Sequence, residues 1–152
     1  MAEALLRQTL ADKDIEWAEV SSGGLVASPM GVAHSQLRRV LGSTYKLVEN
    51  RHSQPLTQEL VRGSDLILGM ENRHVYQIIQ RFPESDGRVE KITTYAGKDG
   101  EIKDFSDSGC GDVVSWLRQC RSIMVPCVEA IADRLVRERD DGSTNLSTEK
   151  VD

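Results

Sequence analysis

Residues 66–70, Leu-Ile-Leu-Gly-Met, form a continuous apolar run of strand length, and this run limits the possible folds more than any other feature of the sequence. A strand that is apolar on both faces has to be covered on both faces, which is typical of a central strand in a parallel sheet. Residues 15–21 and 89–95 are weaker strand candidates. Apolar residues at helical spacing predict helices over residues 1–11, 32–41, 57–62, 71–81 and 112–137. Strands that alternate with helices predict an α/β fold with a parallel sheet, built through right-handed crossovers.

Three strands are few for such a sheet, which usually has about five or six. The first predicted helix is also unusual because no capping residue precedes it. A helix leaves its first amide groups unpaired, and a Ser, Thr, Asp or Asn usually precedes it as a cap. Here the helix begins at Met1, so the positive amino terminus lies at the positive end of the helix dipole. We therefore expect that an opening strand is missing ahead of this helix. Loops are expected at residues 28–31, 43–56 and 97–111, with a helix kink at Pro126.

The charge and hydropathy pattern excludes two classes of function. The 152 residues contain 24 Asp and Glu against 19 Lys and Arg, for a net charge of −5, and no basic stripe of the kind that nucleic acids require. The apolar runs are far shorter than the ~18 residues that a membrane span needs, and no secretory signal pattern is present at the N-terminus. We expect a cytoplasmic protein that binds neither nucleic acid nor membrane. Its organisation is predicted to be one domain over residues 1–137, followed by a disordered acidic tail over residues 138–152.

The three cysteines do not form a disulfide or zinc pattern. The sequence has an odd number of cysteines, Cys110, Cys120 and Cys127. It has no Cys-x-x-Cys pair and no histidine at zinc-finger spacing. Cys120 and Cys127 lie seven residues apart in a predicted helix and are therefore interpreted as small buried apolar groups on one face.

Several segments carry a resemblance to a known family. They are residues 1–7 (Met-Ala-Glu-Ala-Leu-Leu-Arg), 20–24 (Val-Ser-Ser-Gly-Gly), 27–29 (Ala-Ser-Pro), 55–60 (Pro-Leu-Thr-Gln-Glu-Leu) and 65–70 (Asp-Leu-Ile-Leu-Gly-Met). In this order they resemble the low-molecular-weight protein-tyrosine phosphatases, above all the bacterial branch that includes protein-arginine phosphatases. The resemblance covers roughly residues 1–137. It implies a three-layer, flavodoxin-like parallel sheet with helices on both faces, from which the first strand is missing here.

The resemblance also implies that the catalytic loop is absent. In the family a Cys, five residues and an Arg, then Ser-Pro, directly precede the Met-Ala-Glu-Ala segment. The loop amides and a helix N-terminus form an anion nest that lowers the pKa of the thiol, and the Arg binds the phosphate. The residues six positions after the three cysteines are Trp116, Pro126 and Asp133, none of which is Arg. The strand and the loop are therefore expected to be absent from this chain, which we predict to be catalytically inactive.

The second part of the family's catalytic apparatus has a counterpart. The family places an Asp, usually followed by Pro, in a loop before the last helix, where it protonates the leaving oxygen and then activates water. Spacing from Trp116 favours Asp107 for this role, and Asp104 is the alternative. Ser108 and Phe105 replace the usual Pro. From the residues alone, Asp107 can equally be a solvated loop carboxylate or a helix cap.

Two further residues match supporting positions of the family. Ser22 matches a serine that steadies the phosphate loop, although with the loop absent it is interpreted as a turn serine. His52 matches a histidine of the same network, but it lies five residues before Thr57 where the pattern has six, and Arg51 takes that place. The remaining histidines, His34 and His74, are predicted to be surface residues.

Two functions remain open from the sequence. The first is a phosphatase that hydrolyses phosphotyrosine or phosphoarginine of protein substrates through a cysteinyl-phosphate, without metal or cofactor, and whose nucleophile is encoded upstream of Met1. The alternative is a non-catalytic, phosphatase-like binding or regulatory module. Arsenate reductases share the fold, but they place resolving cysteines in the region of residues 71–95, which contains none.

Overall fold

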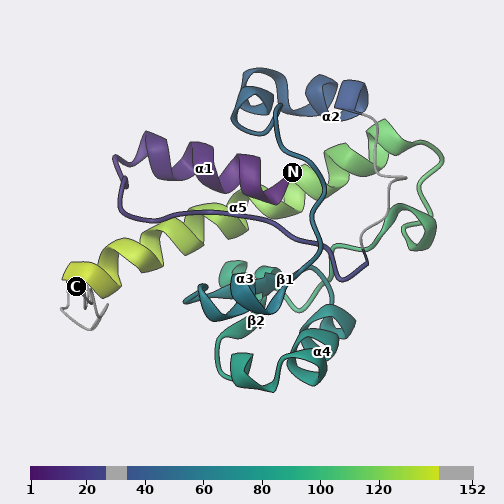
Figure 1. Ribbon diagram of the computed structural model, residues 1–152. Helices are drawn as coiled ribbons and strands as arrows, with labels where there is room; N and C mark the ends of the chain where they lie inside the picture. The colour runs from purple at the N-terminus through teal and green to yellow at the C-terminus, as the bar shows by residue number, and fades with distance from the viewer. Residues whose placement is uncertain (27–33, 141–152) are drawn as a thin grey trace.

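The computed structural model describes residues 1–26 and 34–140 (Figure 1). Its helices and strands, in chain order, are α1 (Ala2–Asp12), α2 (His34–Leu41), α3 (Gln58–Arg62), β1 (Ile67–Gly69), α4 (Asn72–Arg81), β2 (Val89–Lys91) and α5 (Val113–Asp140). Four 3-10 helices join them: η1 (Gly42–Leu47), η2 (Pro83–Ser85), η3 (Ile92–Ala96) and η4 (Phe105–Asp107). The loop expected at residues 28–31, the start of the helix expected at 32–41 and residues 141–152 of the expected tail lie outside the described residues.

The expected parallel pairing is confirmed for β1 and β2. Ile67 pairs with Val89, Leu68 with Glu90 and Gly69 with Lys91, and α4 forms the connection between the two strands. Gly69 is required by this connection, because a Cβ there would lie 3.1 Å from Val75 Cγ2 and 3.3 Å from His74 Cβ of α4. Close packing of α4 on the end of β1 therefore depends on a residue without a side chain.

The sheet is smaller than the sequence predicts, and the expected strand at residues 15–21 is wrong. That segment is irregular, with a bend at Trp17, and is not paired as a strand. The guanidinium of Arg7 donates to the carbonyl of Val20, so one of its polar backbone groups is satisfied by a side chain and not by a ladder. A parallel bridge follows between Gly24 and Pro55, where the Leu56 amide donates to the Gly24 carbonyl at 2.8 Å.

Three other elements differ from the prediction. The strand expected at residues 89–95 ends at Lys91, and η3 follows because Ile92 and Thr93 are buried while the Thr93 hydroxyl donates to the Gly100 carbonyl at 2.6 Å. Residues 42–47, mostly expected to be irregular, form η1 around buried Tyr45. The last helix continues through Pro126 to Asp140, so residues 138–140 are helical.

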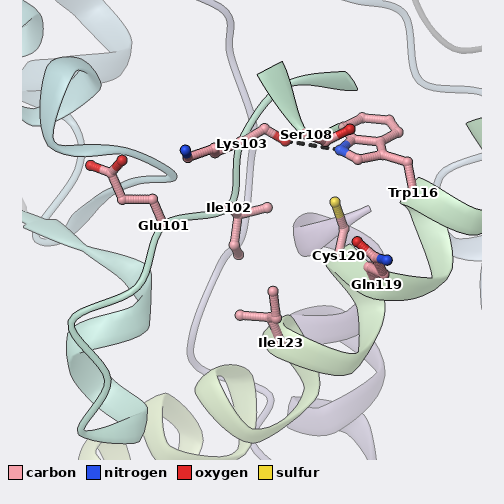
Figure 2. Close-up of a pocket in the computed structure, with 8 residues that line it drawn as sticks. All are labelled: Glu101, Ile102, Lys103, Ser108, Trp116, Gln119, Cys120 and Ile123. Carbon is pink, nitrogen blue, oxygen red and sulfur yellow. Dashed lines mark hydrogen bonds between the residues drawn. The ribbon is translucent and has the colours of Figure 1, made fainter. Parts of the chain in front are cut away.

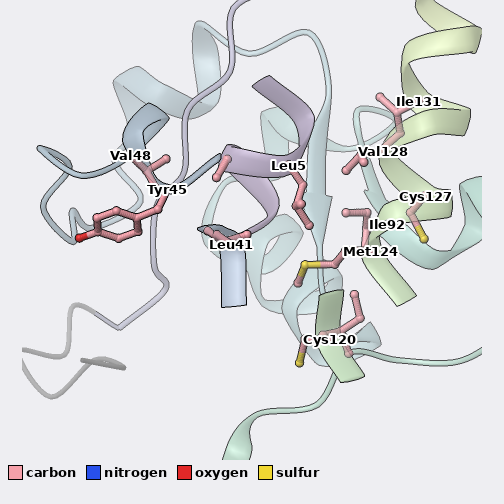
Figure 3. Packing of buried hydrophobic residues seen from close by; sticks show 12 residues of the cluster. Leu5, Leu41, Tyr45, Val48, Ile92, Cys120, Met124, Cys127, Val128 and Ile131 are labelled. Atoms are coloured by element: carbon pink, nitrogen blue, oxygen red, sulfur yellow. The ribbon is translucent and has the colours of Figure 1, made fainter. Parts of the chain in front are cut away.

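The main core lies between α5 and the elements packed on it. Figure 1 shows α1 lying along α5, with α2 and η1 beyond the start of α1. Buried residues from these elements and from η3 form one cluster, part of which is drawn in Figure 3. The labelled members are Leu5, Leu41, Tyr45, Val48, Ile92, Cys120, Met124, Cys127, Val128 and Ile131. The interpretation of Cys120 and Cys127 as buried small groups is confirmed.

Across residues 1–26 and 34–140, no helix has the length and apolar character needed to cross a membrane.

Tyr95, in η3, gives a prediction about stability at high pH. Burial and then the charge of Glu90 raise the pKa of Tyr95 to about 12, and the Arg134 guanidinium donates to the phenol oxygen at 2.7 Å. An unfolded tyrosine ionises near pH 10, so the folded protein binds this proton more tightly and its stability should fall as pH rises from about 10 to 12. Urea unfolding over this range should show a steeper loss in the parent than in Tyr95→Phe. Tyr76→Phe, at an exposed position, should behave like the parent.

Candidate active site

The two predicted acids lie close together around one arginine. Arg73 Nη2 lies 2.9 Å from Asp104 Oδ2 and 3.5 Å from Asp107 Oδ2. The same nitrogen donates to Glu71 Oε1 at 2.8 Å. Glu71, at the start of α4, is buried, whereas both aspartates are exposed. Asp104 is the N-cap of η4 and Asp107 is its last residue, so Arg73 connects the buried carboxylate of α4 to both aspartates of η4. The structure therefore brings Asp104 and Asp107 into one cluster.

The backbone just before these aspartates is held from two sides. The Ile102 amide donates to the Met70 carbonyl at 3.0 Å, just beyond β1. The side chain of Glu101 accepts from the Asn72 amide at 2.8 Å, which satisfies an unpaired donor at the first turn of α4. On the opposite side, the Trp116 indole donates to the Lys103 carbonyl at 2.9 Å. Strand β1 and helix α5 therefore fix the backbone on which Asp104 lies.

The helix cap that was one interpretation of Asp107 is provided by Asp112. The Ser115 amide donates to Asp112 Oδ1 at 2.9 Å, and its hydroxyl donates to Oδ2 at 2.6 Å. These bonds hold the pKa of Asp112 below its ordinary value. Asp107 makes no such capping contact with the described residues: its side chain is 53% exposed and lies in an ion pair with Arg73.

A small pocket of about 130 Å³ lies between this loop and α5 (Figure 2). Its lining residues are Glu101, Ile102, Lys103, Ser108, Trp116, Gln119, Cys120 and Ile123. Cys120 lies on the α5 side with its sulfur towards the loop, and it is 5% exposed. Burial, followed by the charge of Cys110, raises the pKa of the Cys120 thiol. A thiol of raised pKa in the middle of a helix is a poor nucleophile.

The other two cysteines are also unlike a phosphatase nucleophile. Cys127 is fully buried, its thiol donates to the Ile123 carbonyl at 3.1 Å, and burial raises its pKa. The Cys110 thiol donates to Gln119 Oε1 at 3.1 Å. None of the three has an Arg six residues later, and Cys120 and Cys127 lie within α5, where the helix itself uses the backbone amides.

A second buried carboxylate, Glu3 in the first turn of α1, organises the region of Ser22. The Ser22 hydroxyl donates to Glu3 Oε2 at 2.6 Å, and Arg7 Nε donates to Oε1 at 2.9 Å. Arg51 Nε lies 3.5 Å from Glu3 Oε1. The side-chain Nε2 of Gln54 donates to the Ser22 carbonyl at 2.8 Å. Ser22 is thus more than a turn residue. Sequence reasoning missed Glu3, whose signal was a carboxylate four residues before Arg7 in a predicted helix, the spacing of an ion pair.

The histidines do not join these clusters as bases. His52 is exposed, and Arg51, which takes the family histidine's place in the sequence pattern, makes the contact with Glu3. His34 Nδ1 lies 2.6 Å from the Tyr45 hydroxyl, so this residue has a specific partner and not merely a surface position. His74 Nε2 lies 3.9 Å from the Glu71 carboxylate.

Potential metal ligands are present beside Arg73. The ligand atoms of Glu71, His74 and Asp104 all lie within 4.8 Å of one another. Arg73 already donates to the carboxylates of Glu71 and Asp104, and a cation bound there would face its guanidinium or displace it. The donor set therefore fits an ion-pair cluster better than a metal centre.

The start of α1 lies near the same loop. Met1 and Ala2 pack against the cluster that contains Cys120. The same cluster contains Ile102, two residues before Asp104. The N-terminal end of α1, where helix amides favour an anion, and the loop of the two aspartates therefore lie on the side of Cys120.

Comparisons with known proteins show which family the chain resembles. The sequence profile described as low molecular weight phosphotyrosine protein phosphatase matches residues 1–140. A protein-arginine phosphatase of Bacillus subtilis is 29% identical over 140 residues, covering 91% of this chain and 89% of the relative. One from Geobacillus stearothermophilus is 28% identical over 141 residues, covering 91% and 88%.

Solved structures show the same fold. A crystal structure of a YwlE mutant from Bacillus subtilis superposes with a TM-score of 0.70 at 26% identity, over 89% of this chain and 88% of that chain. The tyrosine phosphatase Wzb from Escherichia coli K30, in complex with phosphate, has a TM-score of 0.69 at 23% identity, over 88% and 86%.

Proposed function

The chain belongs to the low-molecular-weight phosphotyrosine protein phosphatase family, and on this basis we propose that it contributes the acid-bearing part of a protein phosphatase site. The substrate in this proposal is a phosphorylated protein side chain, phosphotyrosine or phosphoarginine. The observation that carries the proposal is the cluster in which Arg73 holds Asp104 and Asp107 beside the N-terminal side of α5. Similarity to two protein-arginine phosphatases supports the phosphoarginine alternative.

We assign the general-acid role to Asp107. Asp104 Oδ2 accepts a hydrogen bond from Arg73 at 2.9 Å, so that oxygen is already used. Asp107 Oδ2 lies 3.5 Å from the same nitrogen, a longer contact that leaves the carboxyl group more available to a leaving oxygen. In this proposal Arg73 and Asp104 position the loop, and Asp107 transfers the proton.

The nucleophile is not among these 152 residues. A cysteinyl-phosphate mechanism needs a thiolate in an amide nest and an Arg on the phosphate, and the sequence contains no Cys followed six residues later by Arg. An Asp acid alone supplies a factor of about 10² to 10⁴, which cannot replace the covalent step. We therefore propose that the first strand and the catalytic loop of the family are absent from this polypeptide, and that it is inactive by itself. The missing Cys-x5-Arg pattern also favours a second candidate, a non-catalytic phosphatase-like binding module.

The inactivity is tested with the 152-residue protein, p-nitrophenyl phosphate and a phosphoarginine peptide. We expect release of nitrophenol and phosphate at the buffer rate, with the Bacillus subtilis relative as the active control and circular dichroism to show that the chain is folded. Asp107→Asn and Cys120→Ser should leave this background unchanged. Turnover that either substitution removes would show that these residues already form a working site.

A further inference from the structure

One thiol lies in the loop that carries the predicted acids and another lies on α5 facing that loop. The proposed phosphatase chemistry uses neither. Cys110 is at the end of this loop, two residues before the Asp112 cap, and Cys120 lies on α5. We propose that Cys110 and Cys120 are a peroxide-sensitive pair that forms an intramolecular disulfide and thereby fastens the loop to α5.

Hydrogen bonding holds the Cys110 side chain against α5. Its thiol donates to Gln119 Oε1 at 3.1 Å, and Gln119 is the immediate neighbour of Cys120. Gln119 and Cys120 line the same pocket, and the sulfur of Cys120 faces the loop across it (Figure 2). Because Gln119 and Cys120 are consecutive residues of α5, this bond places the Cys110 side chain beside the turn of α5 that carries Cys120.

The backbone around Cys110 allows this movement. Glycines flank it on both sides, and Gly109 has a φ of +71°, in the left-handed region. A Cβ placed at Gly109 or Gly111 would meet no atom within 4 Å, so neither residue is wedged against the rest of the protein. A disulfide usually needs Cα atoms about 4.4–6.8 Å apart, and a Gly-Cys-Gly segment can adjust to that requirement at low cost.

The two thiols differ in the way that a stepwise oxidation requires. Cys110 is partly exposed and is therefore oxidised first by peroxide, whereas buried Cys120 is shielded from peroxide and reacts, slowly because of its raised pKa, with the sulfenic acid that Cys110 forms. The Cys110 thiolate attacks one peroxide oxygen, the O–O bond breaks, and a sulfenic acid and water result. The Cys120 sulfur then attacks the Cys110 sulfur, the S–O bond breaks and a second water leaves. Two thiols and one hydrogen peroxide thus give one disulfide and two waters.

Peptide mapping of the oxidised full chain tests the proposal. Trypsin cleavage after Lys103, Arg118 and Arg121 places Cys110 in peptide 104–118 and Cys120 in peptide 119–121. After hydrogen peroxide treatment and alkylation in denaturant, we expect two of the three thiols to be lost and these two peptides to be linked. Dithiothreitol should restore all three thiols.

Matched variants separate the proposed pair from unspecific oxidation. Cys127→Ala should still form the link, because Cys127 is fully buried elsewhere in the core. Cys120→Ser should not form it and should leave Cys110 as a sulfenic acid that dimedone labels. Oxidation in urea should lose most of the link, since the fold brings the thiols together. Oxidised Cys110 with Cys120 still free in the parent, a link to Cys127, or a dimer through Cys110 would each overturn the proposal.

Discussion

Ile131→Ala is expected to lower the free energy of unfolding by about 2–5 kcal/mol, the range for removing a large aliphatic side chain from a packed core. Ile131 is 2% exposed and belongs to the α5 face that packs in the main cluster. The two strands contribute only three residues each, so helix packing supplies most of the buried surface. A cavity in the α5 face therefore affects the interaction on which the fold mainly depends. Urea unfolding followed by circular dichroism measures the change.

Val136→Ala is the matched control for this experiment. Val136 lies on the same helix, five residues later, and is 37% exposed. Its substitution should change stability by no more than about 0.5 kcal/mol, as is usual for surface positions. Similar losses for both variants would contradict the expectation that burial in the cluster determines the effect, because helix propensity alone favours Ala over Ile and Val.

The sequence predicts those elements whose pattern is decided locally. The apolar run that contains β1 and the amphipathic pattern of α4 identify a strand and a helix, and α3 begins directly after its Thr57 cap, whose hydroxyl accepts from the Leu60 amide. Residues 15–21 have the composition of a strand but lack a strand partner in the described part of the chain, and pairing is not a property of one segment. Burial of Ile92 and Thr93 in η3 likewise depends on packing against α5, which no local pattern shows.

The candidate site, like the fold, could be predicted only in part from the sequence. Asp104 and Asp107 could be named because a family resemblance points to their loop, and their role as acid remains a prediction. Arg73, which joins them, lies 31 residues from Asp104 in the sequence and has no distinguishing neighbours. Glu3 and Ser22 are separated by 19 residues. Contacts of this kind arise only when the elements are packed, so a single sequence does not predict them.

A strand and a Cys-x5-Arg loop joined directly ahead of Met1 are expected to turn the chain, which we propose to be inactive by itself, into a phosphatase. In the described residues β1 pairs only with β2, so its other edge can accept a parallel strand. The loop would then end at the N-terminal end of α1, where helix amides favour a phosphate. This point lies near the start of the loop that carries Asp104 and Asp107, because Met1 and Ala2 pack against the cluster that contains Ile102 and Cys120. Release of p-nitrophenol by the extended protein measures the gain.

Two variants of the extended protein test whether the gain comes from the proposed site. Replacing the added Cys with Ser should remove all turnover, because the covalent step is lost. Asp107→Asn should lower kcat by about 10²- to 10⁴-fold, the usual contribution of a general acid. Asp104→Asn should have the smaller effect, since Arg73 keeps its contacts with Glu71 and Asp107. A larger loss for Asp104→Asn would reverse the assignment. An extended protein that folds, binds phosphate and does not turn over would favour the binding module, because the acid loop would then lie out of reach of the nucleophile.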